Sequence, residues 1–383
     1  TQEYENLLDR HSEYYLKLLI NVFAEFASER AAAVIRELWL DADNVRVALN
    51  WTMDRQNWPL LLDSIDPLLS VFEMQGRIRE GYDYTAAMMK RVTELVGMQQ
   101  PDIYYALLGW NGTFGFRLGF TQAALGKMQE RLEYAQLQGD WVHAANTQMW
   151  MADYHRRLGE TNTAYQEIQQ SLAILEPLSA TGNPLLSGFY ANALCILGGI
   201  QIKLNQIEAA RQSAERCNTI LHRSPARYVR IRMLEIQAQI ANRDRRYDIA
   251  LNLRQEALVI AEDFNDRRSV AVLLNNLGDS AEHLGDHASS LAYLERASQI
   301  SEEIGDRQIS ALLNNNLGYT TLMLDKIEES LQYYQKALRL YREIGNKVGY
   351  FLTLRDISRA YLKQGNIQAA QARILEALQL GVG

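Results

Sequence analysis

Apolar residues recur every three or four positions along most of the chain, and polar residues occupy the positions between them. The stretch 291–304 illustrates the spacing, because its apolar side chains share one helix face: Leu291, Leu294, Ala297, Ile300 and Ile304. Such stretches end at short strings that contain glycine, such as LGF at 118–120 and LGD at 284–286. Glycine suits the left-handed residue that ends a helix. The pattern predicts an all-α chain of helix, tight turn, helix and short link.

The chain also repeats itself at a step of 40 residues, lengthened once to 46 by the loop SATGNP at 179–184. One column of this repeat holds only small residues: Gly112, Ala152, Gly198, Ala238, Gly278, Gly318 and Ser358. A second column, 12 positions further on, is also small: Ala124, Ala164, Ala210, Ala250, Ser290, Ser330 and Ala370. A third, 19 positions on, is small in six of seven cases: Arg131, Ser171, Cys217, Ala257, Ala297, Ala337 and Ala377. These columns indicate paired helices that approach too closely for larger side chains.

The three columns resemble the tetratricopeptide repeat, a family with small residues at its eighth, twentieth and twenty-seventh positions. The resemblance covers residues 102–383, although the unit is 40 residues rather than 34 and lacks the usual terminal proline. It implies an α-solenoid, a right-handed superhelix of antiparallel helix pairs whose first helices line a concave surface. We divide residues 60–383 into about seven or eight repeats: 60–96 (atypical), 102–138, 141–178, 184–222, 225–264, 266–304, 306–344 and 346–380.

Residues 1–59 do not follow the repeat and are interpreted as a helical linker or capping segment, with helices predicted at 4–27, 31–40 and 41–56. One string in this segment is informative: Asp43, Asn44, Val45, Arg46, Ala48, Leu49 and Trp51. It resembles the helical segment before the repeats of STAND-type signalling ATPases, a class that includes large bacterial transcription regulators. The resemblance implies a nucleotide-binding module in a longer parent chain, and the start at Thr1 favours a fragment.

Composition argues against a nucleic-acid-binding, disulfide-bonded or membrane protein. The chain has 383 residues, a net charge of −7 and a pI of about 5.5, so general nucleic-acid binding is not expected. Cys195 and Cys217 form neither a disulfide framework nor a zinc spacing, which favours a reducing, cytoplasmic setting. The sequence shows no signal peptide and no uninterrupted apolar run of about 18 residues, so we expect no membrane contact.

Catalytic chemistry is not expected either. The nearest approach to a phosphate-binding loop is GFTQAALGK at 119–127, where the glycine spacing is wrong and a repeat helix is predicted. His283 and His287 have the spacing of metal ligands on a helix, but Gly285 places a turn between them. We therefore predict a non-enzymatic chain without catalytic residues, metal ligands or a cofactor.

The resemblance implies that groove residues lie at offsets −6, −3, +1, +4 and +5 from the first small column, positions that share one helix face. At offset +5, five of seven residues are basic: Arg117, Arg157, Lys203, Arg243 and Lys363. Four more arginines accompany them: Arg156, Arg232, Arg355 and Arg359. Such a basic stripe suits an acidic peptide, a phosphorylated ligand or a small anionic effector. The alternative is a charge-balanced, solvated lining, neutralised by Asp153, Glu235, Asp279 and Glu282.

Ten residues are the candidate ligand contacts: Asn275, Asn315, Asp279, Tyr319, Arg157, Lys203, Arg243, Arg355, Arg359 and Lys363. In related repeats a groove asparagine holds the backbone of an extended peptide, because one amide both donates and accepts. Asn275 and Asn315 occupy that column, whereas Asn276 and Asn316 are expected at the seam between neighbouring helices. We expect Asn275→Ala combined with Asn315→Ala to abolish partner binding while thermal stability barely changes.

Two functions of different classes agree with these features. The first is the sensor and oligomerisation arm of a STAND-type ATPase or transcription regulator, with homo-oligomers as one output. The second is a free-standing adaptor that binds a peptide in its concave groove. In both, the partner is a protein, a peptide or a small anionic effector, without direct contact with nucleic acid.

Overall fold

The chain is helical throughout the part that a computed structural model describes, which is every residue except 1, 25–32, 34–40, 224–226 and 380–383. The described residues form 18 helices and contain no strand, which confirms the predicted fold class. Two helices precede the solenoid, α1 (Gln2–Ala24) and α3 (Ala42–Asp54). The helix predicted at 31–40 lies outside the described residues, apart from Ala33.

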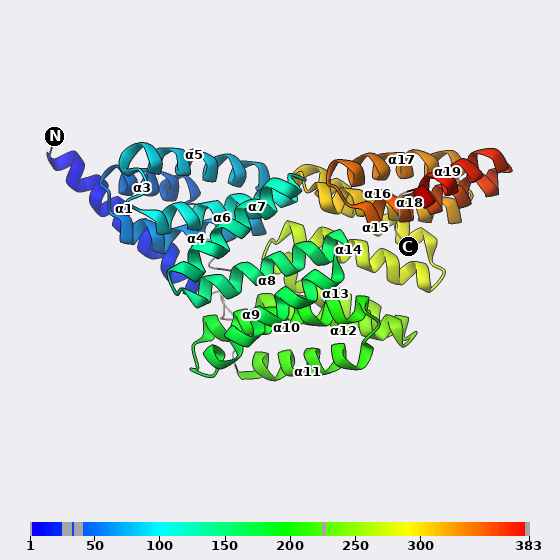
Figure 1. The fold of residues 1–383 in the computed structure, drawn as a ribbon, viewed down its shortest axis with the longest axis horizontal. Coiled ribbons are helices and arrows are strands. Elements are labelled where there is room, and N and C mark those ends of the chain that lie inside the picture. The colour runs from blue at the N-terminus through cyan, green and yellow to red at the C-terminus, as the bar shows by residue number, and fades with distance from the viewer. Residues whose placement is uncertain (1, 25–32, 34–40, 224–226, 380–383) are drawn as a thin grey trace.

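Sixteen helices follow as antiparallel pairs joined by short turns (Figure 1). The first four pairs are α4 (Trp58–Met74) with α5 (Ile78–Val96), α6 (Pro101–Arg117) with α7 (Thr121–Leu137), α8 (Trp141–Leu158) with α9 (Thr161–Ser179), and α10 (Pro184–Lys203) with α11 (Ile207–Arg223). The last four are α12 (Arg227–Arg243) with α13 (Tyr247–Asp263), α14 (Arg267–His283) with α15 (His287–Ile304), α16 (Arg307–Met323) with α17 (Ile327–Glu343), and α18 (Lys347–Gln364) with α19 (Ile367–Gln379).

The small columns lie where the two helices of each pair meet. Every residue of the three columns is buried, and the first and second columns face each other across the pair. Ser330 Oγ, for example, donates a hydrogen bond of 2.6 Å to the carbonyl oxygen of Gly318. Arg131, the large exception, is buried over Gly109, where a Cβ atom would clash with its guanidinium. The predicted close approach of paired helices is therefore confirmed.

The turn inside each pair uses one residue with a left-handed backbone. Seven pairs share this position in register with the 40-residue repeat: Gly119, Gly159, Asn205, Arg245, Gly285, Asp325 and Gly365. A positive φ is accessible to glycine at little cost and is disfavoured for residues with a Cβ atom. The glycine strings in the sequence therefore predicted the turns correctly, and three further turns form without glycine.

The N-terminal helices dock onto the first pair through the string quoted above. Val45, Ala48 and Leu49 of α3 are buried, and the Trp51 Nε1–H donates to Asp9 of α1 at 2.8 Å. Arg46 Nη1 lies 3.2 Å from the Glu80 carboxylate of α5. The string thus ties α3 to helices on both sides of it.

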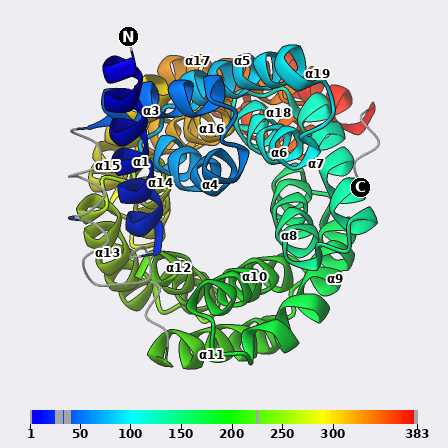
Figure 2. The same ribbon diagram turned by 90° about the vertical axis from the view of Figure 1, so that its left-hand side faces the viewer.

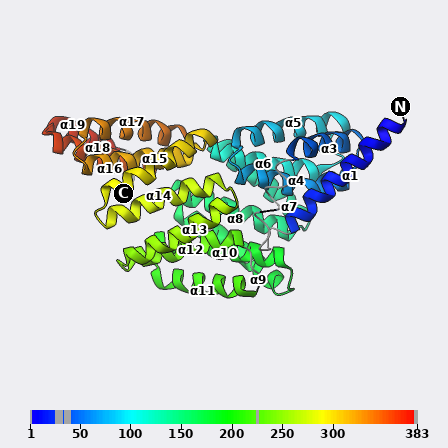
Figure 3. The same cartoon turned by 180° about the vertical axis from the view of Figure 1, so that it is seen from behind.

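The solenoid winds into a superhelix in which first helices of the pairs, such as α8, α10 and α12, face inwards, and second helices such as α9, α11 and α13 lie outside (Figure 2). The segments α1–α7 and α15–α19 lie along one side of the molecule, with α9–α13 along the other (Figures 1 and 3). The turns of the early pairs touch the turns of the late pairs, so the superhelix meets itself after one revolution.

Three hydrogen bonds define this inter-turn seam, which we name by its six residues: Phe116, Thr121, Arg157, Gln308, Ile344 and Asn346. Thr121 Oγ1 donates to the carbonyl oxygen of Ile344 at 2.7 Å, and Asn346 Nδ2 donates to that of Arg157 at 3.1 Å. Gln308 Nε2 donates to the carbonyl oxygen of Phe116 at 3.4 Å. Segments about 190 to 220 residues apart in sequence therefore share one interface.

Helix α10 is the most apolar helix of the inner layer. It is the one helix of the described part that is long and apolar enough to cross a membrane, and 67% of its apolar window is buried inside the protein. No uninterrupted apolar run marks it in the sequence. Its composition is that of a core helix, because both of its neighbours in the superhelix and its own partner α11 cover it.

Candidate functional site

A cavity of about 430 Å³ lies on the inner face of the superhelix, and we call it the inner cavity. Helices α8, α10, α12, α14 and α16 contribute most of its wall, and Tyr341 and Asn346 close it from the inter-turn seam side. The apolar part of the wall contains Ile196, Ile231, Ile236, Val272, Leu273, Ile309 and Leu312. The polar part contains Asp153, Arg156, Arg157, Lys203, Arg232, Glu235, Gln239, Arg268, Asn275, Asn276 and Gln308.

The cavity is lined by different positions of the repeat in each inner helix. In α8 it uses offsets +1, +4 and +5 from the first small column, whereas in α16 it uses offsets −10, −9 and −6. Each pair is rotated relative to the previous one, so successive inner helices present a progressively more N-terminal level to the same space. The predicted offsets therefore describe the correct face, and the rotation selects which repeat contributes which offset.

Positive charge dominates the wall. Five cationic side chains line the cavity against two carboxylates, which leaves three positive charges in excess. Asp153 is fully buried and accepts from Arg156 Nη2 at 2.6 Å and from Arg157 Nε at 2.8 Å. Burial alone would raise the pKa of the Asp153 carboxyl, but Arg157 and Arg156 hold it well below its usual range. Asp153 is therefore an anchor for the two arginines and stays ionised.

Two cations of the wall, Lys203 and Arg157, lie in surroundings that disfavour their charge. Burial lowers the pKa of Lys203 to about 8, and the nearby charges of Arg156 and Arg157 add to the effect. Burial also lowers the pKa of Arg157 to about 9; Asp153 opposes this change, and Arg268 and Arg117 reinforce it. A guanidinium or an ammonium with a lowered pKa is one whose charge the surroundings disfavour.

A second ion-pair cluster supports the wall from behind. Arg117 is fully buried and donates to Glu73 at 2.7 Å, and Arg268 Nε donates to Asp306 at 2.9 Å. Burial opposes ionisation of Glu73, but Arg117 and then Arg268 keep its pKa below the ordinary value. These pairs join α4, α6, α14 and the start of α16, so they link the inner cavity to the contact between superhelical turns.

The asparagines of the repeated LLNN strings form a ladder between α14 and α16. Asn275 Nδ2 donates to Asn276 Oδ1 at 3.0 Å, and Asn275 Oδ1 accepts from Asn316 Nδ2 at 2.9 Å. Asn315 instead accepts from Thr353 Oγ1 of α18 at 2.7 Å. Asn275 is only 3% exposed, although it borders the cavity together with Asn276. The side-chain amides of Asn275 and Asn276 are therefore committed partly to each other.

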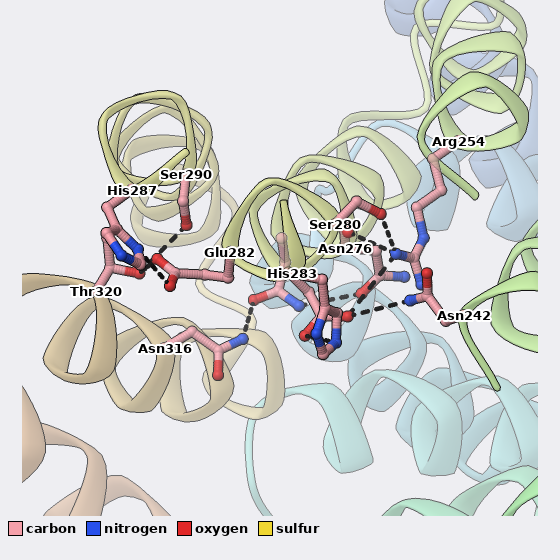
Figure 4. Close-up of polar contacts among 12 residues, drawn as sticks. Asn242, Arg254, Asn276, Ser280, Glu282, His283, His287, Ser290, Asn316 and Thr320 are labelled. Carbon is pink, nitrogen blue, oxygen red and sulfur yellow. Dashed lines mark hydrogen bonds and ion pairs between the residues drawn. The ribbon is translucent and has the colours of Figure 1, made fainter. Parts of the chain in front are cut away.

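Further polar contacts fix α14 between its neighbours (Figure 4). Arg254 Nη1 of α13 donates to the carbonyl oxygen of Asn276 at 2.8 Å and to Ser280 Oγ at 2.6 Å. On the other side, the Glu282 carboxylate accepts from Thr320 Oγ1 at 2.7 Å and lies 2.8 Å from His287 Nδ1. The His287 imidazole therefore pairs with the Glu282 carboxylate of α14 and not with His283.

Comparison with known families decides what these helix pairs are. Residues 230–303 and 308–380 match the model of the tetratricopeptide repeat. The chain contains tetratricopeptide repeats. None of the curated proteins compared with the chain matches its sequence.

Solved structures with tetratricopeptide repeats, or with the same solenoid fold, superpose on the chain. A Rap protein complexed with competence and sporulation factor gives a TM-score of 0.64 at 13% identity and covers 98% of both chains. Aspartyl phosphate phosphatase F from Bacillus subtilis gives 0.54 at 13% identity, over 96% of this chain and 94% of that one. A STAND protein with a tetratricopeptide repeat sensor from Pyrococcus horikoshii gives 0.51 at 15% identity, over 79% of this chain and 46% of that one. These likenesses concern the fold alone.

The helix pairs bring three of the ten predicted contacts to the inner cavity: Arg157, Lys203 and Asn275. Asn315, Asp279, Tyr319 and Arg243 lie outside its wall, as do Arg355, Arg359 and Lys363. The last three are paired near the C-terminal end, the arginines with Asp356 and the lysine with Asp325. The cavity adds Arg268 and Asn276, which the predicted offsets did not include. Offset −10, that of Arg268, continues the chosen helix face one turn towards the N-terminus, and Asn276 was expected at the seam between helices.

Asn275 is a poorer probe of binding than the sequence suggested. Replacing it with alanine would leave the Asn316 amide and the Asn276 oxygen without their partner. A buried polar group that loses its partner costs about 1–3 kcal/mol of folding free energy. The expectation that Asn275→Ala with Asn315→Ala leaves stability almost unchanged therefore conflicts with the hydrogen bonds of this ladder.

Proposed function

We propose that this chain is a non-catalytic tetratricopeptide repeat protein that binds a peptide, or an extended segment of a protein, in the inner cavity. One observation carries the proposal: a concave wall combines an apolar side chain open to solvent with several amides. Leu312 is 41% exposed there, next to the amide-bearing residues Gln239, Asn276 and Gln308. Amides pair with both groups of a peptide backbone, and apolar pockets accept its side chains. The Rap protein, which has the same fold, was solved in complex with competence and sporulation factor, and this supports a binding role for the chain.

The non-catalytic part of the proposal rests on the chemistry of the wall. Hydrogen bonding to Cys217 at 3.4 Å, together with burial, raises the pKa of the Cys195 thiol, so Cys195 is a poor nucleophile. The one carboxylate with a strongly shifted pKa, Asp153, is locked between two arginines. Lys203, whose pKa is lowered to about 8, donates to the carbonyl oxygen of Arg156 at 2.6 Å rather than to a nucleophilic side chain. Two free thiols also agree with a cytoplasmic location.

We further propose that the chain acts as the sensor and oligomerisation arm of a STAND-type ATPase or transcription regulator. The docking of α3 onto α1 and α5 through the quoted string supports this assignment. A free-standing adaptor is the second candidate, favoured by the superposition of the Rap protein over 98% of both chains. Sequencing the gene upstream of the codon for Thr1 separates them: a phosphate-loop motif there is expected for the STAND assignment, and its absence rejects it.

Peptide selection tests the binding function directly. Random peptides displayed on phage are selected on the purified chain, and the enriched peptides are titrated by fluorescence anisotropy. We expect binders whose affinity falls about five- to tenfold with Leu312→Ala, because binding buries the exposed part of the Leu312 side chain, which is worth about 1–1.4 kcal/mol at about 0.8 kcal/mol per methylene group.

Leu284→Ala is the matched control, since Leu284 is a 51% exposed leucine at the end of α14, outside the wall of the cavity. Its affinity should equal that of the wild type. Failure to enrich any peptide, or equal losses for Leu312→Ala and Leu284→Ala, would reject peptide binding in the inner cavity.

A further inference from the structure

Two guanidinium groups at the inner cavity have N–H donors for which the described part of the chain supplies no acceptor. Arg268 is 7% exposed, and its Nη2 atom is buried without a hydrogen-bond partner, although its Nε atom is paired with Asp306. Arg232 makes no hydrogen bond or ion pair within the described part of the chain, and its guanidinium lies 5.1 Å from the ring centre of Trp150. A buried donor without an acceptor, such as Arg268 Nη2, is rare in folded proteins, because it costs free energy.

Both groups belong to one side of the cavity. They lie in the first halves of the neighbouring inner helices α12 and α14, and both act electrostatically on the Glu73 carboxyl. Glu73 does not neutralise them, since its oxygen is bound to the fully buried Arg117 at 2.7 Å.

The remaining carboxylates are committed as well. Asp153 holds Arg156 and Arg157, and Glu235 accepts from Arg254 and Gln239 at 2.9 to 3.2 Å. The ion-pair partners behind the wall are the guanidiniums of Arg117 and Arg254 and the carboxylates of Glu73, Asp306 and Asp279, so the excess falls from three positive charges to two. Asp266 caps α14 through the Ser269 N–H, and with its charge counted the excess is still positive.

We propose that the ligand of the inner cavity carries an anionic group, a carboxylate or a phosphate, that binds to Arg232 and to the free Nη2 of Arg268. The inference rests on the proposed peptide-binding function and names the ligand class for the same site. An anion there accepts the hydrogen bonds that the chain leaves unmade and offsets the excess of positive charge. The apolar and amide wall beyond α12 then holds the neighbouring part of the peptide.

Small anions test the subsite without knowledge of the natural ligand. Citrate supplies carboxylates and pyrophosphate supplies phosphates, and each is titrated at an ionic strength matched with sodium chloride while Tm is followed. We expect the wild type to gain Tm with one or both anions beyond the effect of chloride. A larger response to citrate indicates an acidic peptide, and a larger response to pyrophosphate indicates a phosphorylated one.

Arg232→Gln is the informative variant, because Arg232 makes no hydrogen bond that folding needs and the substitution removes one charge. We expect at least a tenfold loss of anion affinity with little change in Tm without anion. Arg230→Gln is the matched control, two residues earlier in α12, where the exposed Arg230 is paired with Glu256. Lys203→Gln should lose affinity too, because Lys203 belongs to the same wall.

Three results of the anion titration overturn the proposal: no gain in Tm above that with chloride, equal losses of anion affinity in Arg230→Gln and Arg232→Gln, or full anion affinity in Arg232→Gln. A fourth comes from the peptide selection, if the selected peptides lack acidic residues. The last result leaves peptide binding intact and rejects only the anionic group. If the anions bind at Arg232 but no peptide is selected, peptide binding fails while the anion subsite stands. Selected peptides rich in aspartate or glutamate that bind Arg232→Gln weakly support both.

Discussion

At the scale of the residue, the two LLNN strings show how a poor helix former is kept in a helix. Asparagine competes for backbone hydrogen bonds, so its presence in a helix interior needs a compensating partner. Asn275 finds two side-chain amides, Asn276 and Asn316, while Asn315 finds the Thr353 hydroxyl of the next inner helix. The bonds to Asn316 and Thr353 cross from one repeat to the next, and the sequence alone does not show which amide meets which.

We predict that Asn275→Ala lowers the free energy of unfolding by about 1 kcal/mol, because the half-buried amides of Asn276 and Asn316 lose their partner. Urea unfolding followed by circular dichroism measures the change. Asn50→Ala serves as the control, since Asn50 is exposed on α3 and alanine favours helix there. An Asn275→Ala protein as stable as Asn50→Ala would show that the ladder contributes nothing.

At the scale of the element, each helix pair is defined by its turn and its small columns. Four of the seven aligned turns place glycine at the left-handed position, and Asn205 and Asp325 are the short polar residues that tolerate this conformation. Arg245, with a φ of 59°, is the least suited. The sequence pattern therefore locates the turns, and the departures from glycine mark pairs that carry backbone strain.

Arg245→Gly should raise the free energy of unfolding by about 0.5–1 kcal/mol, because glycine adopts a positive φ without steric cost. Replacing Gln255, an exposed residue in the middle of α13, by glycine should lower it by a similar amount, because glycine weakens a helix interior. Thermal unfolding of both variants tests whether stability rises with the first substitution and falls with the second. A destabilised Arg245→Gly protein would contradict the assignment of strain to this turn.

At the scale of the whole molecule, the superhelix is closed on itself by the inter-turn seam. Thr121 and Asn346 donate to backbone carbonyls across more than 180 residues of chain, and the second of these carbonyls belongs to Arg157 in the wall of the inner cavity. A repeat array without such contacts is held by neighbouring repeats alone. The seam therefore couples the pitch of the superhelix to the shape of the cavity.

Thr121→Val combined with Asn346→Asp removes both donors while keeping side-chain shape and the cap that Asn346 provides to the Gly349 N–H. We expect a larger radius of gyration by small-angle X-ray scattering, and faster amide exchange around residues 117–121 and 343–347, with unchanged helix content. Thr93→Val is the control, because Thr93 Oγ1 bonds only within its own helix. An unchanged radius and unchanged exchange would show that the seam does not hold the pitch.

Much of the fold was predictable because it depends on short-range patterns. The small columns specify that two helices of one repeat meet, since a residue such as Gly318 leaves room for the facing helix. The glycine strings specify where those helices turn. The division into repeats remains a prediction, since helix bounds alone do not assign repeat borders. The identity of the inner helix face followed from the resemblance, and the cavity uses that face.

The sequence by itself therefore determined that the chain is an α-solenoid, where its helices turn and which face they present inwards. Only the tertiary structure decided that Arg157, Arg232 and Arg268 reach one cavity while Arg355 and Arg359 do not. The reason is the rotation between successive repeats, which is small for each pair and accumulates over many. A 40-residue period states which positions are equivalent, but equivalent positions in a superhelix lie at different levels around its axis.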